Sequence, residues 1–499
     1  MSRLIHLTTT TSRLVARWLW RGFLAVAGLC LAVALGFTLY AVGALPPLQP
    51  WHTERLQQEF SAWKHADLDF EGYLQLEERL FEELRTKAAT WPRDEAFVHS
   101  RFNPDGLLNR LAAGSPHNRS FRLKADAPAG AALLIHGLSD SPYSMKALAE
   151  SLHARGIDVT VVRLPGHGTL PSMMTEMSYR DWTTATRIAA RAAAARAPAG
   201  TPFYIGGYST GATLSLLYAL DSLDDSSLRR PDRVLLVSPA IELTRVAALA
   251  NIIDIASVVP MPVLEKVRWQ EVVAEFDPYK FNSFPVNASR QVNRATRELQ
   301  RTLARARESG RIAQMPPVTA WQSAVDSTVG ASGTVDVLFA ALQGPEHRLV
   351  LFDVNRSEAF RSVQRPGARM LIERTARDAR SYTLDLVTNV DRQQDQVVVH
   401  RLAPDGTRQE LATGLAWPRD LVSLGHVALP FPPDDPVYGF RPGSGRDGVP
   451  SIGSWLLRGE SGATTVSLGS LTRLRSNPFW SLIDQEIGEY VAADRVKAR

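Results

Sequence analysis

The sequence predicts an α/β fold built around a mostly parallel sheet, and two observations predict it. From residue 119 onward, short apolar runs alternate with stretches of helical patterning. The runs at 131–135 (AALLI) and 234–237 (VLLV) are apolar throughout, as strands buried on both faces of a parallel sheet are. Helical patterning at 145–155 and 179–197 lies between such runs, which places helices on both faces of one sheet.

Length and charge narrow the class of protein. A chain of 499 residues with 45% hydrophobic content can form one large domain with insertions or two ordinary domains. Residues 1–22 hold four arginines and no acid, so they account for +4 of the formal net charge of +5. The rest of the chain is nearly neutral, which argues against a nucleic-acid partner. The single cysteine, Cys30, excludes an intramolecular disulfide.

A long apolar stretch follows the basic tail at 1–22. Residues 23–43 carry no charge and are long enough, as a helix, to cross a bilayer. The arginines before this stretch predict a cytoplasmic N-terminus and an exported body, periplasmic or extracellular, anchored in a bacterial inner membrane. The alternative is a signal peptide cleaved near 42–44, but the stretch is longer than the usual apolar region of roughly 7–15 residues. We therefore expect an uncleaved single-pass anchor.

The segment at 44–118 is expected to be a helical spacer. Its apolar positions fall at helical spacing among many charges, which suits helices that pack on the main domain or hold it away from the membrane. No residue pattern in it points to chemistry. The main domain is expected at 119–499.

A five-residue motif marks the centre of that domain. Residues 207–211 (GYSTG) match the G-x-S-x-G nucleophile elbow, in which a serine on a strained turn stands clear of the sheet. Glycine at the outer positions tolerates unusual dihedral angles and the close approach of neighbouring backbone. An apolar strand at 201–206 precedes the motif and a helix at 212–220 follows it, as the elbow requires. We therefore expect Ser209 to be a nucleophile.

Four motifs, taken in order, resemble those of the α/β-hydrolase fold. They are HGLSDSPYS at 136–144, RLPGHGT at 163–169, YRDW at 179–182 and GYSTG at 207–211. More narrowly, they are similar to the monoacylglycerol lipases, lysophospholipases and prolyl-aminopeptidase-like serine hydrolases, which have a serine aminopeptidase-type domain. The resemblance covers roughly 119–238 and resumes at Asp326.

The resemblance implies a lid over the active site at about 240–315, where helical patterning dominates. Within it, the stretch at 252–263 is apolar and interrupted by proline. That composition suits a surface facing lipid or substrate and suits an ordinary buried lid core equally well. The basic helix at 290–311 is expected to be a solvated face.

A nucleophilic serine needs a histidine as its base and an acid that orients the histidine. In α/β hydrolases these residues follow in the order Ser, Asp, His, at the carboxyl ends of strands. The strand at 316–325 ends at Asp326, and its loop is similar to the acid loop of the family. Of the later histidines, His347 precedes a strand and His400 lies within one, so His426, in a proline-rich loop, is the predicted base.

The path to His426 departs from the simplest family pattern. The histidine would ordinarily follow the strand that ends near Asp353, but that position reads Asn355-Arg356-Ser357. We interpret 356–424 as an insertion that contains a β-hairpin, with strands at 382–390 and 396–402, after which the chain returns to the site.

Two backbone amides are expected to bind the oxyanion of the tetrahedral intermediate. The amide of Thr210 follows the nucleophile and belongs to the elbow itself. The resemblance makes the amide of Leu138 the second donor. His136 and His167, in the first and second motifs, are expected to be structural.

These observations predict a membrane-anchored serine hydrolase that cleaves a lipid-like or other small carboxylic ester through an acyl-enzyme. No metal or organic cofactor is expected. One alternative is a serine aminopeptidase-like amide hydrolase, which needs an acid to hold the substrate's amino group. The candidates are Glu265, Glu271, Glu275 and Asp277. The other alternative is a non-catalytic hydrolase-fold binding protein, although such proteins typically lack a triad member.

Overall fold

A ten-stranded sheet runs through the body of this computed structural model, in the order β1-β3-β2-β4-β5-β8-β9-β10-β11-β12. The strands are β1 (Phe121–Leu123), β2 (Ala131–Ile135), β3 (Asp158–Val162), β4 (Phe203–Tyr208), β5 (Arg233–Val237), β8 (Val318–Ser323), β9 (Arg348–Phe352), β10 (Thr383–Asn389), β11 (Gln396–Leu402) and β12 (Arg408–Ala416). All neighbours from β3 to β10 pair in parallel, whereas β1, β11 and β12 pair antiparallel. The mostly parallel sheet predicted from the sequence is confirmed.

The structure describes residues 2–106, 117–242, 262–361, 364–365, 367–378, 380–441, 451–454 and 473–497. Its helices include α1 (Ser2–Ala44), α2 (Pro50–Thr53), α3 (Ala62–His65), α4 (Phe70–Ala89), α5 (Glu95–Val98), α7 (Lys146–His153), α8 (Tyr179–Ala194), α9 (Thr210–Asp221), α11 (Val286–Glu308), α12 (Ala331–Gly333), α13 (Met370–Arg377) and α15 (Trp480–Lys497). A second, two-stranded sheet joins β6 (Trp269–Glu271) to β7 (Phe284–Pro285).

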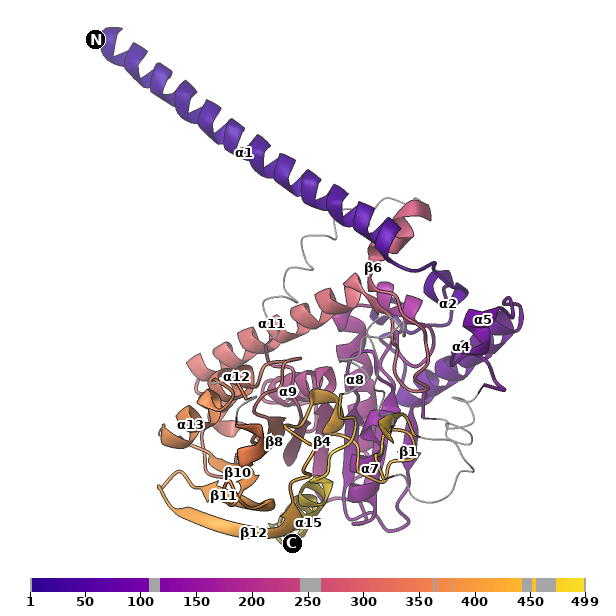
Figure 1. The fold of residues 1–499 in the computed structure, drawn as a ribbon, viewed down its shortest axis with the longest axis vertical. Coiled ribbons are helices and arrows are strands. Elements are labelled where there is room, and N and C mark those ends of the chain that lie inside the picture. The colour runs from indigo at the N-terminus through magenta and orange to yellow at the C-terminus, as the bar shows by residue number, and fades with distance from the viewer. Residues whose placement is uncertain are drawn as a thin grey trace.

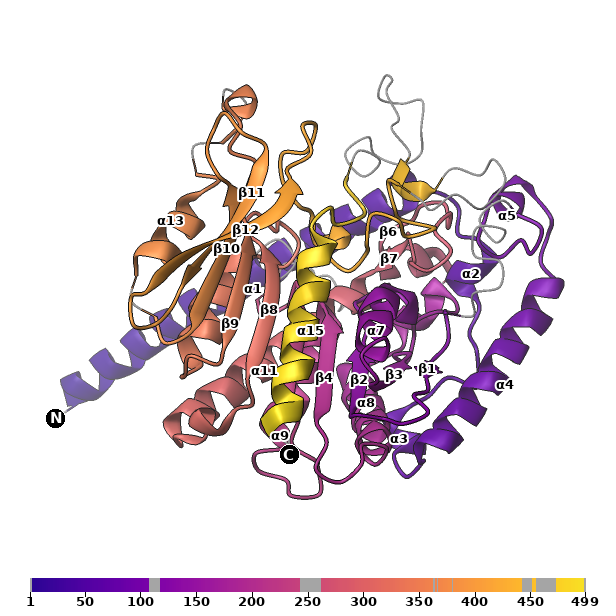
Figure 2. The same ribbon diagram turned by 90° about the horizontal axis from the view of Figure 1, so that it is seen from below.

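Helices cover both faces of the large sheet. Figure 2 shows α7 and α15 in front of it and α11 behind it. Along β2, Leu133 and Ile135 pack into the core that contains α8 and α9, whereas Ala132 and Leu134 pack into the core that contains α7 and α15. Both faces of the strand are therefore apolar, which explains the uninterrupted run of apolar residues.

The segment between α1 and β1 is tied to the domain by a buried charge cluster. The side chain of Arg163, which follows β3, is 1% exposed. Its Nη2 lies 2.9 Å from Glu59 Oε1, and its Nε lies 3.0 Å from Oε2 of Glu77, on α4. The buried guanidinium thus faces two carboxylates, and each of the three groups has an opposite charge beside it.

The helix α1 projects from the body (Figure 1). One window of it among the described residues, Ala16–Val33, has the length and composition of a membrane span, with a mean hydropathy of 1.4 and no burial. At its carboxyl end, Lys266 Nζ donates a hydrogen bond to the carbonyl oxygen of Leu45 at 2.9 Å. The 3-10 turn Pro262–Arg268 therefore lies against the exit of α1.

The region at 356–424 extends the main sheet. β10 pairs in parallel with β9, and β11 then pairs antiparallel with β10. A third strand, β12, which is not predicted from the sequence, pairs with β11. Its side chains are mostly exposed and lack the apolar alternation by which a strand is recognised.

The region expected to be a lid begins after β5. Residues 243–261, which hold most of the apolar stretch at 252–263, lie outside the described residues. The described remainder includes β6, β7 and α11. α11 packs on α9 through its apolar face, including Val292 and Leu299, and exposes Arg294 and Arg301 to solvent, as the sequence predicts.

Candidate active site

Ser209 lies in the turn between β4 and α9, with φ of 54° and ψ of −115°. A positive φ is strained for a residue other than glycine, so the surrounding structure must hold it. Two backbone contacts do so. The N–H of Ser209 donates to the carbonyl of Val237 at 2.9 Å, and the N–H of Ala240 donates to the carbonyl of Ser209 at 3.2 Å.

The two outer glycines of the motif have no room for a side chain. A Cβ on Gly207 would lie 2.3 Å from the carbonyl carbon of Gly211. A Cβ on Gly211 would lie 2.0 Å from the carbonyl oxygen of Ile135, in the neighbouring strand β2. The close packing of turn, helix and strand therefore demands glycine at both positions.

His426 and Asp326 form a buried hydrogen-bonded pair. His426 Nδ1 lies 2.8 Å from Asp326 Oδ2, and both side chains are at most 5% exposed. Burial alone would raise the pKa of Asp326. The charge and hydrogen bond of His426 and the backbone N–H groups of Val329 and Thr328 outweigh it, so the pKa lies below its usual value. An ionised carboxylate only accepts hydrogen bonds, so Nδ1 carries the proton and Nε2 is free to act as a base.

The chain reaches this pair by returning to the end of β9. Val354 forms a bridge with Ser423, and the N–H of Asn355 donates to the carbonyl of Val422 at 2.7 Å. Ser323, at the end of β8, donates its hydroxyl to the carbonyl of Leu424 at 2.8 Å. The 3-10 turn His426–Ala428 follows directly. His426 thus arrives beside the strand end where the family pattern expects a histidine, after some seventy intervening residues.

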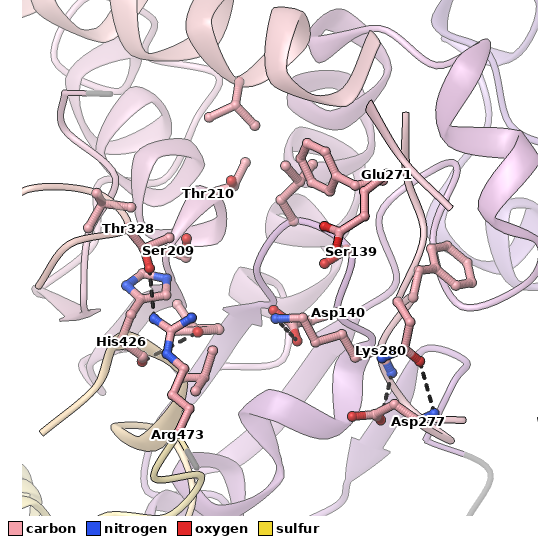
Figure 3. Close-up of a pocket in the computed structure, with 18 of the residues that line it drawn as sticks. Ser139, Asp140, Ser209, Thr210, Glu271, Asp277, Lys280, Thr328, His426 and Arg473 are labelled. Atoms are coloured by element: carbon pink, nitrogen blue, oxygen red, sulfur yellow. Dashed lines mark hydrogen bonds and ion pairs between the residues drawn. The ribbon is translucent and has the colours of Figure 1, made fainter. Parts of the chain in front are cut away.

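Ser209 and His426 line one cavity of about 780 Å³ (Figure 3). Leu138 and Thr210 line it as well. Thr210 is the first residue of α9, so its N–H has no acceptor within the helix. The structure therefore brings all five residues predicted for the site, with Asp326 behind His426, to one place.

Aromatic and aliphatic side chains make up much of the remaining wall. They are Val273, Phe276, Phe281, Phe284, Val292, Phe431 and Tyr438. Most come from the region between β6 and α11. An apolar wall combined with polar groups that can orient a ligand is typical of a site for a small organic molecule.

The histidines of the first two motifs support the backbone. His136 Nε2 accepts a hydrogen bond from the N–H of Leu164 at 2.9 Å, and its Nδ1 lies 2.8 Å from the carbonyl of Gly137. His167 Nδ1 lies 3.0 Å from the carbonyl of Pro165. Burial lowers the pKa of His167 to about 4 and that of His136 well below its usual value. Both rings are therefore neutral and hold loops in place.

The four acidic residues that could bind the amino group of a peptide substrate lie in different places. Glu275 is buried and accepts hydrogen bonds from the N–H groups of Asn282 and Ser283. Asp277 lines the cavity but is engaged by Tyr438 and Arg475. Glu271 lines the cavity, whereas Glu265 lies in the turn Pro262–Arg268, apart from the lining residues. In the described part of the chain, no group of three or more His, Cys, Asp or Glu residues could hold a metal ion.

Sequence reasoning missed the charged residues of the cavity wall. Asp140, Lys280, Arg473 and Arg475 all line the cavity. Asp140 belongs to the first motif, HGLSDSPYS, and that motif is the one signal that could have drawn attention to it. The other three lie in segments without a motif, so only the fold brings them together.

A family model and a curated protein match parts of this chain. Residues 126–353 match the family described as serine aminopeptidase, S33; this range includes Ser209 and Asp326 and ends before His426. A thermostable monoacylglycerol lipase from a Bacillus species is 33% identical over 87 residues, which is 17% of this chain and 34% of the relative. The match thus covers about a third of that relative's length.

Solved structures are similar as well. A lipolytic enzyme derived from a metagenome has 21% identity and a TM-score of 0.38. The alignment covers 48% of this chain and 89% of the chain of that enzyme. A monoacylglycerol lipase from Paleococcus ferrophilus has 18% identity and a TM-score of 0.34, covering 47% and 88%. The strand order, the elbow and the family match together show that the chain contains an α/β-hydrolase domain similar to serine aminopeptidases of family S33 and to monoacylglycerol lipases.

Proposed function

We propose that this protein is a serine esterase that cleaves carboxylic esters, lipid-like ones among them, through an acyl-enzyme. The observation that carries the proposal is the 2.8 Å hydrogen bond between His426 and Asp326 at the cavity that holds Ser209 on a strained turn. A hydroxyl, an imidazole oriented by a carboxylate and that buried carboxylate are the three groups that acyl transfer requires.

In the first half of the reaction, His426 Nε2 takes the proton of the Ser209 hydroxyl while the Ser209 oxygen attacks the ester carbonyl. The oxyanion that forms accepts hydrogen bonds from the amides of Leu138 and Thr210. His426 then gives its proton to the alcohol oxygen, the carbon–oxygen bond breaks and the alcohol leaves. Asp326 orients the imidazole throughout and stabilises its positive charge.

In the second half, a water molecule replaces the alcohol. His426 removes a proton from the water, which attacks the acyl carbon, and the same two amides bind the second oxyanion. Return of the proton to Ser209 releases the carboxylic acid and restores the free enzyme.

We further propose that α1 anchors the protein in a membrane, with the catalytic domain on the exported side. The apolar, fully exposed window at 16–33 supports this. In this proposal the region between β5 and α11 acts as a lid, and β10 to β12 are the insertion that delays the catalytic histidine. The bond from Lys266 to Leu45 links this lid to the exit of the anchor.

Fluorophosphonate labelling tests the catalytic proposal without knowledge of the substrate, because the probe needs an activated serine. The full-length protein in detergent is expected to be labelled, and the Ser209→Ala variant is expected to remain unlabelled. An unlabelled, folded wild type would contradict the proposal and favour a binding protein with a hydrolase fold.

A serine aminopeptidase is the second candidate. Glu271 lines the cavity, and no ion pair engages it within the described part of the chain. Its carboxylate is therefore available to bind the amino group of a peptide. Cleavage of aminoacyl amides that is lost in Glu271→Gln, with fluorophosphonate labelling retained, would favour this candidate over the esterase.

A further inference from the structure

The charged side chains of the cavity are unequally paired. Lys280 Nζ lies 3.8 Å from Asp140 Oδ1, and Arg475 Nη1 lies 3.5 Å from Asp277 Oδ2. Arg473, the third cation that lines the cavity, has no ion pair to any carboxylate of the described residues. Arg473 and Glu271, which also lines the cavity, are therefore the two charges of the wall without an ion pair among the described residues.

Arg473 lies close to the predicted catalytic residues. Its Nη2 donates a hydrogen bond to Thr328 Oγ1 at 2.8 Å, and the N–H of Thr328 donates to Asp326 Oδ1 at 2.8 Å. A Cβ on Gly425, the residue before His426, would lie 3.5 Å from Arg473 Nε. Figure 3 draws the guanidinium next to the His426 ring. The fold thus holds this charge next to the base.

A guanidinium in this position can bind an anion. It carries a positive charge and offers five N–H donors, of which Thr328 takes one. The planar fork of the remaining donors matches the oxygens of a carboxylate or a phosphate. Arg473 is exposed, so water and salt partly screen such a contact.

We propose that Arg473 binds an anionic group, a carboxylate or a phosphate, on the alcohol portion of the substrate ester. The assignment of the anion to the alcohol portion, and not to the acyl portion, follows from the proposed function, on which this inference rests. His426 must give its proton to the alcohol oxygen, so the alcohol leaves beside the imidazole, where Arg473 lies. The acyl portion stays on Ser209 and extends away from Arg473. The preferred substrates are therefore acyl esters of negatively charged alcohols.

Four water-soluble butyrate and succinate esters test this without the complication of micelles. Butyryl glycerol is neutral, butyryl glycerol 3-phosphate and 3-butyryloxypropionate carry a phosphate or a carboxylate on the alcohol, and monomethyl succinate carries its carboxylate on the acyl side. We expect the wild type to favour one or both alcohol-side anions over butyryl glycerol in kcat/KM. Which of the two is favoured distinguishes a phosphate from a carboxylate as the natural group.

The Arg473→Gln variant should lose roughly tenfold or more in kcat/KM for the favoured anionic ester, mainly through KM, since a charge-assisted contact is removed. Its kcat/KM for butyryl glycerol should stay within about twofold of the wild-type value, because the neutral ester makes no ionic contact with Arg473. Arg473→Lys should retain part of the preference. Arg301→Gln, which removes an exposed arginine on α11 outside the cavity, should leave all four values unchanged and controls for net charge.

Fluorophosphonate labelling of the same samples separates the two proposals. A labelled wild type without any preference for alcohol-side anions would overturn the role of Arg473 and leave the esterase standing. Equal losses on neutral and anionic esters in Arg473→Gln would also overturn it, because they would make Arg473 a support for the loop of Asp326. An unlabelled wild type would instead overturn the esterase and the inference together.

Discussion

The N–H of Asn355 donates to the carbonyl of Val422 at 2.7 Å, across a loop of more than sixty residues. The side-chain amide of Asn355 also donates to the carbonyl of Leu421 at 3.0 Å. These two bonds close the loop that carries β10, β11 and β12 and return the chain to the end of β9. Because His426 follows four residues later, this closure determines where the imidazole lies.

Replacing Asn355 by alanine should reduce kcat more than it reduces stability. The substitution removes the side-chain bond to the carbonyl of Leu421, which still accepts a hydrogen bond from Trp417 Nε1, so the cost is about 0.5–1.5 kcal/mol. We expect the melting temperature to fall only slightly. The kcat of ester hydrolysis should fall clearly. Arg419→Ala, which breaks an exposed ion pair to Asp395 on the same insertion, should change neither quantity.

The elbow should not tolerate a methyl group. Gly207→Ala and Gly211→Ala each place a Cβ within 2.3 Å of backbone atoms, so we expect destabilisation above roughly 4 kcal/mol or loss of soluble protein. Gly367→Ala is the matched control, since its Cβ would meet only Met370 Sδ, at 3.4 Å. Urea unfolding measures the difference. Wild-type stability in Gly211→Ala would contradict the close packing between the elbow and β2.

The buried cluster around Arg163 should be a determinant of stability. Arg163→Met leaves the buried carboxylates of Glu59 and Glu77 without a counter-charge, which costs about 3–5 kcal/mol. Arg187→Met removes an ion pair to Asp221 whose arginine is 46% exposed, so it should cost less than about 1 kcal/mol. Thermal unfolding of the two variants should therefore differ clearly. Equal melting temperatures would show that the cluster contributes nothing.

Stability should fall as the pH drops below 6.5, in part because of His52. Burial lowers the pKa of His52 to about 3 in the folded protein, where its ring bonds Ser283 and the N–H of Gln49. In the unfolded chain, His52 binds a proton with its ordinary pKa of about 6.5. The stability that the neutral, buried His52 contributes is therefore fully present above pH 6.5 and is lost as the pH falls from 6.5 to 3.

The slope assigned to His52 is measurable. One proton bound by the unfolded state alone corresponds to about 1.4 kcal/mol per pH unit. We expect His52→Gln to reduce the pH dependence of unfolding between pH 6 and 4 by about one proton. An unchanged slope would mean that the folded protein already protonates His52 in this range.

The sequence predicts those parts of the molecule that local patterns determine. β2 and β5 are apolar because both faces of the sheet are covered, and the GYSTG motif marks the elbow because two of its positions exclude any side chain. β12 lacks such a pattern because its side chains are exposed, so periodicity cannot reveal it. The position of Arg473 depends on contacts between distant segments, and nothing in its own surroundings along the chain indicates a cavity.

The role of His426 is predicted from the sequence only in part. Elimination of His347 and His400 points to it, and the structure places His347 Nδ1 as an acceptor for the N–H of Val318, at the opposite end of the sheet strand from the site. No local signal, however, shows that the chain returns to Asp326 after so long an insertion. That information lies in the contacts of Val354 and Asn355 with 422–423.

The rate at which a fluorophosphonate modifies Ser209, with the adduct located by peptide mass spectrometry, tests the central claim most directly. We predict a single adduct on Ser209 in the wild type and a rate at least roughly a thousandfold lower in His426→Ala, because the base that activates the hydroxyl is gone. A wild-type rate in His426→Ala, or an adduct on another residue, would contradict the assignment of these two residues as nucleophile and base.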